Sequence, residues 1–150
     1  MPISVESHPR LTGIAAPLRV LVTAALALEG RRPGAITVLL TDDTALRALN
    51  HRWRGLDRAT DVLSFAYEER RGRVNGDLAI SLERMREQAK RFRASPGREL
   101  ARLAVHGALH LAGLDHARPA ERLHMRGRER RALRMGAASI RAIDRALARS

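Results

Sequence analysis

The stretch Val105–His116, VHGALHLAGLDH, constrains the fold of this chain more than any other. His106 and His110 are four residues apart, so on a helix they lie on one face, about one turn from each other. Gly113 follows three residues later and can adopt a positive φ, which ends a helix and turns the chain back. His116 can then reach the same point from outside the helix. This spacing predicts that His106, His110 and His116 bind one metal ion and leave a fourth position open, as in catalytic zinc sites.

The same stretch can be compared with the metzincin signature H-E-x-x-H-x-x-G-x-x-H, which it matches at every position but one. Gly107 stands where the peptidase has its glutamate base. The pattern therefore predicts the ligand geometry of a metalloenzyme without the general base of a peptidase. The alternative is that the three histidines are unrelated structural residues, which the regular spacing and the glycine at the turn disfavour.

The composition fits one globular domain that spans residues 1–150, since 150 residues with 45% hydrophobic content can bury a core. No cysteine is present, so disulfides and thiolate ligands are excluded and a metal must be held by His, Asp or Glu. The N-terminus does not resemble a signal peptide, and the apolar run Ala24–Leu28 is too short to span a bilayer. We therefore expect a cytoplasmic protein that does not associate with membranes.

The positive charge is the strongest compositional signal. The net charge is +12, and Lys90 is the one lysine among 28 basic residues. Arginine forks match phosphate oxygens, so a polyanion such as RNA is a plausible partner. Residues 118–150 hold ten arginines against three acidic residues. A solvated surface, with arginine favoured by coding composition, is the alternative explanation.

Apolar periodicity and turn residues predict alternating strands and helices. We expect a central, buried helix that starts at Pro96 after Ser95 as N-cap and carries the histidines in its last two turns. The polar segment His51–Thr60 is expected to be an exposed connection, and Glu68–Asn75 is expected to be a loop or hairpin tip. The predicted strands are Ile3–Ser7, Ala35–Thr41, Asp61–Ala66 and Gly76–Ser81, and the predicted helices are Leu11–Glu29, Asp42 or Asp43 to Asn50, Ser81–Arg93, Pro96–Ala112, Pro119–Met135 and Ala137–Ser150.

A second polar cluster lies in Asn50–Phe65, where Arg54 is the residue of chemical interest. A fixed guanidinium stabilises charge on the non-bridging oxygens of a phosphodiester. Nearby carboxylates and hydroxyls can orient Arg54 or support a ligand histidine, and the candidates are Asp61, Ser64 and Asp77. Arg54 can equally be one surface arginine among many. The role of Asp115 stays open: it can act as a base, accept a hydrogen bond from a ligand histidine, or cap the turn.

Several sequence blocks, in order, resemble the YbeY family of bacterial rRNA maturation endoribonucleases, from about Ile36 to Gly136. The block HGALHLAGLDH at His106–His116 is the most specific, and Gly107 is the residue that the family itself has there. The other blocks are TDD at Thr41–Asp43, LN at Leu49–Asn50, Arg54, TDVLSF at Thr60–Phe65, GDLAIS at Gly76–Ser81, and then Met125, Glu129 and Gly136. The chain departs from the family at Ala59, Ala66, Leu114 and Arg126.

The resemblance implies a zinc-dependent, single-strand-specific endoribonuclease that binds one Zn²⁺ per chain through His106, His110 and His116. It implies a catalytic and substrate-binding role for Arg54. It further implies 16S rRNA 3′-end maturation and ribosome quality control, with the small ribosomal subunit and assembly factors as partners. The implied fold is α+β and zincin-like: a small, mostly parallel four-stranded sheet with a central metal-binding helix and surrounding helices.

Two other functions are considered. A zincin-type metallopeptidase is disfavoured because the glutamate base is missing at Gly107. A non-catalytic ribosome-assembly factor with a structural metal is the second, and a fourth protein ligand such as Asp77 or Asp115 would favour it because it would close the site.

Overall fold

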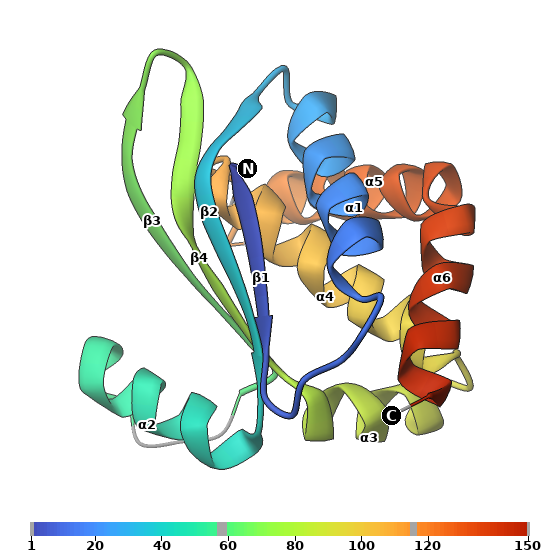
Figure 1. Cartoon of the computed structure of the whole chain (residues 1–150). Coiled ribbons are helices and arrows are strands. Elements are labelled where there is room, and N and C mark those ends of the chain that lie inside the picture. Colours follow the sequence, from blue (N-terminus) through green and yellow to red (C-terminus); the bar gives the residue numbers. More distant parts are fainter. Residues whose placement is uncertain (1, 57–59, 115–116, 150) are drawn as a thin grey trace.

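The computed structural model describes residues 2–56, 60–114 and 117–149, and it contains one sheet with most of its helices packed on one face (Figure 1). The predicted α+β class is confirmed. In chain order the elements are β1 Ile3–Ser7, α1 Ala15–Leu28, β2 Arg32–Thr41, α2 Asp43–Arg54, β3 Val62–Arg70, β4 Arg73–Ser81, α3 Leu82–Arg91, α4 Pro96–Leu111, α5 Pro119–Met135 and α6 Ala137–Ala148.

The four strands form a mixed sheet in the order β1-β2-β4-β3. β1 pairs with β2 and β2 pairs with β4 in parallel, so two of the three pairings agree with the mostly parallel sheet that was expected. β3 is the exception, because it pairs antiparallel with β4 through a tight turn and forms an edge of the sheet.

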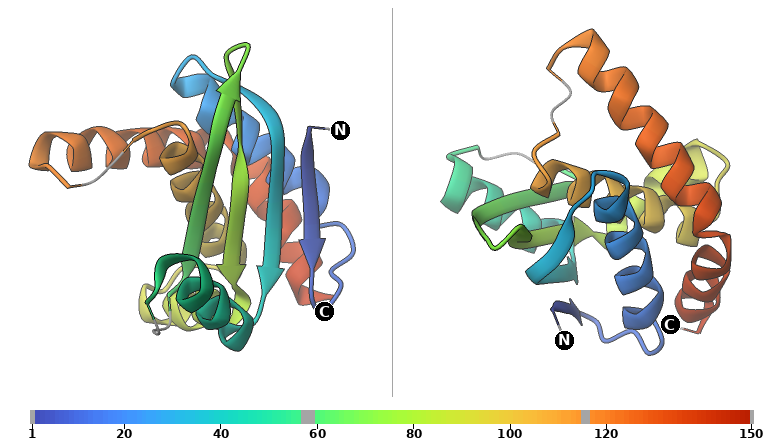
Figure 2. Two further views of the ribbon diagram at one scale, coloured as in Figure 1. Left: turned by 90° about the vertical axis from the view of Figure 1, so that its left-hand side faces the viewer. Right: turned by 90° about the horizontal axis from the view of Figure 1, so that it is seen from above.

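The two faces of the sheet are covered very differently (Figure 2). One face carries Val38, Leu40, Leu78 and Ile80, which are fully buried in the main core beneath α1 and α4. The opposite face is covered by α2 at one end, through a small cluster of Leu46, Leu63 and Ala79. Because side chains alternate along a strand, successive residues of β3 serve these two faces in turn.

The helix α4 is the centre of the larger layer, as predicted. Ser95 accepts a hydrogen bond from the Arg98 amide at 3.1 Å, and Pro96 occupies the first turn, where a missing N–H costs nothing. Leu100, Ala104 and Leu109 are fully buried. The helix contacts α1, α3, α5, α6, β3 and β4, so it is packed between the sheet and the other helices.

Two predicted connections are partly helix or strand. The segment His51–Thr60 was expected to be a connection, but α2 continues through Arg54 and ends at Gly55, which has φ +69°. The polar residues of this segment suggested a connection, but they are equally compatible with a helix here, because α2 lies on the surface and buries only Leu46 and Asn50. Within Glu68–Asn75, β3 continues to Arg70 and β4 begins at Arg73, so only Arg71 and Gly72 form the turn. The hairpin tip that was expected for Glu68–Asn75 is therefore confirmed only for Arg71 and Gly72.

Among the described residues, no helix has both the length and the apolar character needed to cross a membrane.

Candidate functional site

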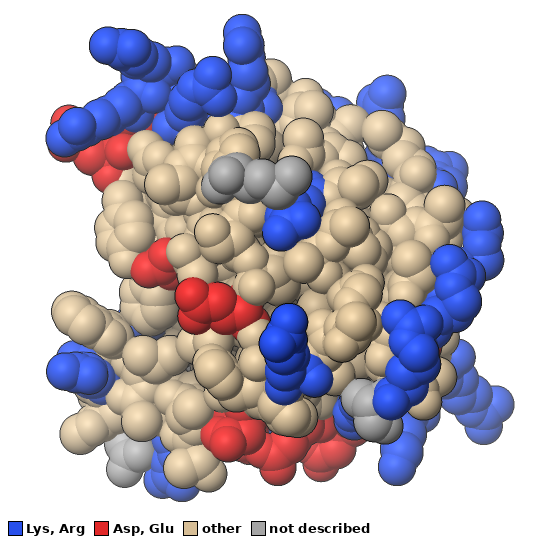
Figure 3. All heavy atoms as spheres, viewed as in Figure 1, with Lys and Arg blue, Asp and Glu red and all other residues tan. Residues whose placement is uncertain are grey.

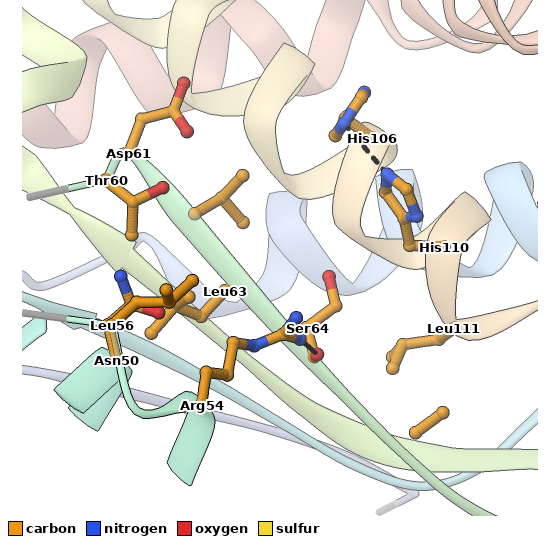
Figure 4. A pocket seen from close by; sticks show the side chains of 12 residues that line it. Asn50, Arg54, Leu56, Thr60, Asp61, Leu63, Ser64, His106, His110 and Leu111 are labelled. Carbon is orange, nitrogen blue, oxygen red and sulfur yellow. Dashed lines mark hydrogen bonds between the residues drawn. The ribbon is translucent and has the colours of Figure 1, made fainter. Parts of the chain in front are cut away.

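His106 and His110 lie side by side in the last two turns of α4 (Figure 4). Their Nε2 atoms are 3.2 Å apart, and the ring centroids are 4.7 Å apart with the planes at 68°. The i, i+4 spacing therefore brings one nitrogen of each imidazole to a common point, as the sequence predicts.

The end of α4 has the geometry that the glycine predicts. Gly113 adopts φ +99°, and its N–H donates to the His110 carbonyl at 2.9 Å while the Leu114 N–H donates to the Leu109 carbonyl at 3.1 Å. This pair of bonds is the Schellman motif, in which a left-handed residue reverses the chain just past the helix. The chain turns back immediately after the two histidines.

The histidine pair fits a zinc ion. Two nitrogens bound to one tetrahedral zinc at about 2.0–2.1 Å lie roughly 3.3–3.4 Å apart, close to the 3.2 Å between these Nε2 atoms. In the described part of the chain, no group of three or more His, Cys, Asp or Glu side chains has the arrangement of a metal site. The predicted third ligand, His116, and Asp115 beside it lie outside the described residues. The metal-binding role of the triad therefore stays a prediction.

Both imidazoles line a cleft of about 650 Å³, which we call the histidine cleft. Arg54 enters it from α2, on a different side from α4 (Figure 4). The Arg54 guanidinium donates a hydrogen bond to the Ser64 carbonyl and lies 5.2 Å from the centroid of the Phe65 ring. Arg54 is thus held against the edge strand β3 at the rim of the cleft. The cleft is lined among others by Asn50, Arg54, Asp61, Ser64, His106 and His110.

A charged network behind His106 was not predicted from the sequence. Glu129 on α5 approaches His106 Nδ1 at 3.3 Å, and it also lies 4.0 Å from Arg102. Arg102 in turn binds the carboxylate of the buried Glu99 with bonds of 2.9 and 2.7 Å. This bond to Glu99 raises the pKa of Arg102, so the guanidinium stays charged.

The network fixes which nitrogen of His106 faces the cleft. When Glu129 accepts a hydrogen bond from Nδ1–H, the neutral imidazole keeps its lone pair on Nε2, which is the atom facing His110. Glu129 was noted in the sequence as part of a family block, but its 23-residue separation from His106 carries no periodic signal.

Gly107 faces the sheet rather than the cleft. A Cβ atom at this position would lie 2.8 Å from Cδ2 of Leu78 and 3.4 Å from Cγ2 of Val62. The glycine therefore allows α4 to pack closely on β4. A glutamate here would point into the core, which gives a structural reason for the missing peptidase base.

The polar residues proposed to assist Arg54 have separate positions. Ser64 holds Arg54 through its backbone carbonyl, while its hydroxyl lies 3.5 Å from the Gly107 carbonyl. Asp61 lines the histidine cleft and accepts a hydrogen bond from Gln88 at 3.1 Å. Asp77 lies in a different groove and accepts a hydrogen bond from Tyr67, so among the described residues it lies with neither Arg54 nor the pair His106 and His110.

This arrangement suits chemistry on an anion. Imidazole nitrogens bind a divalent metal, and a guanidinium fork matches the oxygens of a phosphate or carboxylate. The cleft brings the two groups together on α4 and α2, with a polar lining contributed by Asn50 and Ser64.

Comparison with known proteins agrees with the fold. The solution structure of TM1509 from Thermotoga maritima superposes with a TM-score of 0.69 at 25% identity, covering 93% of this chain and 92% of that one. The relative named "Endoribonuclease YbeY" from Exiguobacterium sp. is 37% identical over 145 residues, which is 87% of this chain and 92% of the relative.

A relative of the same name from Anaeromyxobacter sp. is 44% identical over 126 residues, which is 83% of this chain and 66% of the relative. The match spans just under two thirds of the length of the two Anaeromyxobacter relatives. The family model described as "Endoribonuclease YbeY" matches residues 14–136. On this coverage the chain belongs to the YbeY family.

Proposed function

We propose that this protein is a zinc-dependent endoribonuclease that cuts single-stranded RNA. The observation that carries the proposal is the convergence of His106 and His110 in a cleft that also holds Arg54. Its membership of a family described as endoribonucleases supports RNA as the substrate. We further propose that it acts in the cytoplasm in 16S rRNA 3′-end maturation and ribosome quality control, with the small ribosomal subunit and its assembly factors.

Each residue has a distinct part in this proposal. His106, His110 and His116 hold the zinc ion, and Glu129 orients His106 so that Nε2 faces the cleft. When bound, zinc supplies Lewis-acid chemistry, since it polarises a phosphoryl oxygen or lowers the pKa of a water to about 7. Arg54 stabilises the negative charge that develops on the non-bridging oxygens during cleavage.

The nucleophile can be a water or the 2′-hydroxyl of the RNA, and the products distinguish these. Attack by the 2′-hydroxyl leaves a 2′,3′-cyclic phosphate, whereas attack by water leaves a linear phosphate. Analysis of the RNA ends at early times therefore identifies the cleaving step.

The first test separates the metal site from the guanidinium. We expect His110→Ala to lose both zinc binding and cleavage of a single-stranded RNA. We expect Arg54→Ala to bind zinc normally and to lose cleavage by roughly 100-fold or more, in line with the loss of one transition-state charge contact. Zinc content by elemental analysis and a gel-based cleavage assay give the two readouts.

The matched control is Arg47→Ala, which removes an exposed arginine from the same helix α2 and should keep both properties. Full cleavage by a metal-depleted His110→Ala protein would remove zinc from the mechanism. Loss of zinc by Arg54→Ala would make Arg54 a structural residue.

The net charge of +12 also suits a ribosome-assembly factor that binds rRNA without cutting it, with the metal in a structural role. That function predicts rRNA binding with no cleavage by the zinc-loaded protein.

A further inference from the structure

A second groove lies on the face of the sheet opposite α4. It has a volume of about 460 Å³ and is bounded by α2 at one end of the sheet and by β3, β4 and β2 along its floor. In the space-filling view, the surface between α2 and the β3–β4 hairpin is mostly free of charged side chains, with acidic patches toward the centre (Figure 3).

The groove concentrates the aromatic residues of the chain. The chain has only four, and Trp53, Phe65 and Tyr67 all line this groove. Trp53 and Tyr67 are 66% and 56% exposed, although large aromatic rings normally bury most of their surface. We call this surface the aromatic groove.

Arginines flank the aromatic rings. The guanidinium of Arg52 lies 5.7 Å from the centroid of Trp53, and that of Arg54 lies 5.2 Å from the centroid of Phe65. Exposed rings interleaved with arginines are the arrangement by which proteins bind single-stranded nucleic acid, because bases stack on the rings and the cations neutralise the backbone.

The aromatic groove meets the histidine cleft at the edge strand β3. Ser64 lines the cleft and Phe65 lines the groove, and Arg54 contacts both residues. A strand of RNA that crosses this edge can therefore have its bases in the groove while a phosphate lies beside Arg54 in the cleft.

The polar groups of the groove favour bases over phosphates. Asp77 and Glu6 line it, and Tyr67 donates a hydrogen bond to Asp77 that raises the pKa of the phenol. Carboxylates repel phosphate but accept hydrogen bonds from the amino groups of bases such as cytosine. On the basis of the endoribonuclease function proposed above, we propose that the aromatic groove is a stacking surface for unpaired RNA bases next to the cleavage site.

The chain offers a direct probe, because Trp53 is its only tryptophan. We expect an oligocytidylate RNA to quench Trp53 fluorescence saturably when added to the protein in the presence of a chelator, which prevents cleavage. A duplex RNA of the same length and inorganic polyphosphate should not quench it, because neither offers an unpaired base.

Variants of the exposed ring on β3 test the stacking. We expect Tyr67→Ala to weaken oligocytidylate binding roughly tenfold, within the range measured for the loss of one stacked base. Tyr67→Phe keeps the ring and should bind within about twofold of the wild type on the same reasoning. Phe92→Ala is the matched control, since Phe92 is the fourth aromatic, is 60% exposed at the end of α3 and does not line the groove.

Two results would overturn the proposal: unchanged Trp53 fluorescence on RNA binding, or equal affinity of the wild type and Tyr67→Ala for oligocytidylate. Either result would favour a protein as the partner of the groove. Failure of the endoribonuclease function is a different result, because it appears as RNA binding with quenching but no cleavage by the zinc-loaded protein. Cleavage that is undiminished in Tyr67→Ala on a long single strand would overturn the stacking surface alone.

Discussion

Glu129 is the residue whose effect on the histidine pair can be measured most directly. Replacing it with glutamine removes the negative charge beside His106 Nδ1 with little change in shape. Because such carboxylates orient ligand histidines and raise their basicity, we expect Glu129→Gln to weaken zinc affinity about 10–100-fold. Competition with a chromophoric chelator measures the affinity.

The control for this prediction is Glu121→Gln, which removes a carboxylate from the first turn of the same helix α5. We expect its zinc affinity to equal that of the wild type, while the loss of a negative charge at the N-terminus of the helix lowers the thermal stability slightly. Equal zinc affinity in Glu129→Gln would show that Glu129 only packs against His106. Nitrogen NMR of the metal-free protein gives an independent readout, since Glu129 should hold the proton of His106 on Nδ1.

At the residue scale, spacing along the chain predicts only the part of the site that is local, while Arg54 was singled out by its chemistry and by the family resemblance and does line the same cleft. His106 and His110 are one helical turn apart, so their proximity follows from α-helical geometry alone. Gly113 was identified for its ability to adopt positive φ, and it does. The contacts between Arg54 and Ser64, and between His106 and Glu129, join separate elements, and no pattern within one element encodes them.

At the scale of elements, Gly107 sets how closely α4 approaches the sheet. We expect Gly107→Glu to lower the free energy of unfolding by roughly 3 kcal/mol or more, because a carboxylate would be buried against Leu78 without a partner. Urea denaturation measures this change. The same variant should not gain peptidase activity, since position 107 faces the core.

Gly107→Ala is the comparison. Its methyl group would crowd Leu78 at a cost of about 1–3 kcal/mol, and the better helix propensity of alanine offsets about 1 kcal/mol of that cost. A Gly107→Glu protein as stable as the wild type would mean that α4 can move away from β4.

The elements themselves were largely predictable. The apolar strands and α4 are buried, so they stand out in the sequence as apolar runs bounded by turn residues or by a helix cap. The predicted secondary structure was wrong in two surface segments, namely the last turn of α2 and the outer part of the β3–β4 hairpin. Polar residues are compatible with a surface helix or strand as well as with a loop. Pairing between β3 and β4 extends the hairpin, and Gly55 sets the end of α2.

At the scale of the whole molecule, the charge of +12 acts on every anionic partner. Each phosphate that the protein neutralises releases counterions, so we expect the affinity for single-stranded RNA to fall roughly tenfold or more between about 50 and about 200 mM salt. Binding isotherms over a salt series give the slope. An RNA analogue with an uncharged backbone should show almost no slope, and an equally steep slope for that analogue would contradict a phosphate-based interaction.

The contact between the Arg54 side chain and β3 has a consequence for self-association. An outermost strand exposes unpaired peptide groups, which invite a strand of another molecule to add to the sheet. The side chain of Arg54 already donates a hydrogen bond to the Ser64 carbonyl, so the strand of an incoming chain would have to displace the guanidinium before it could pair with β3 at this residue. The arginine that we propose for substrate chemistry thereby also discourages polymerisation along this border.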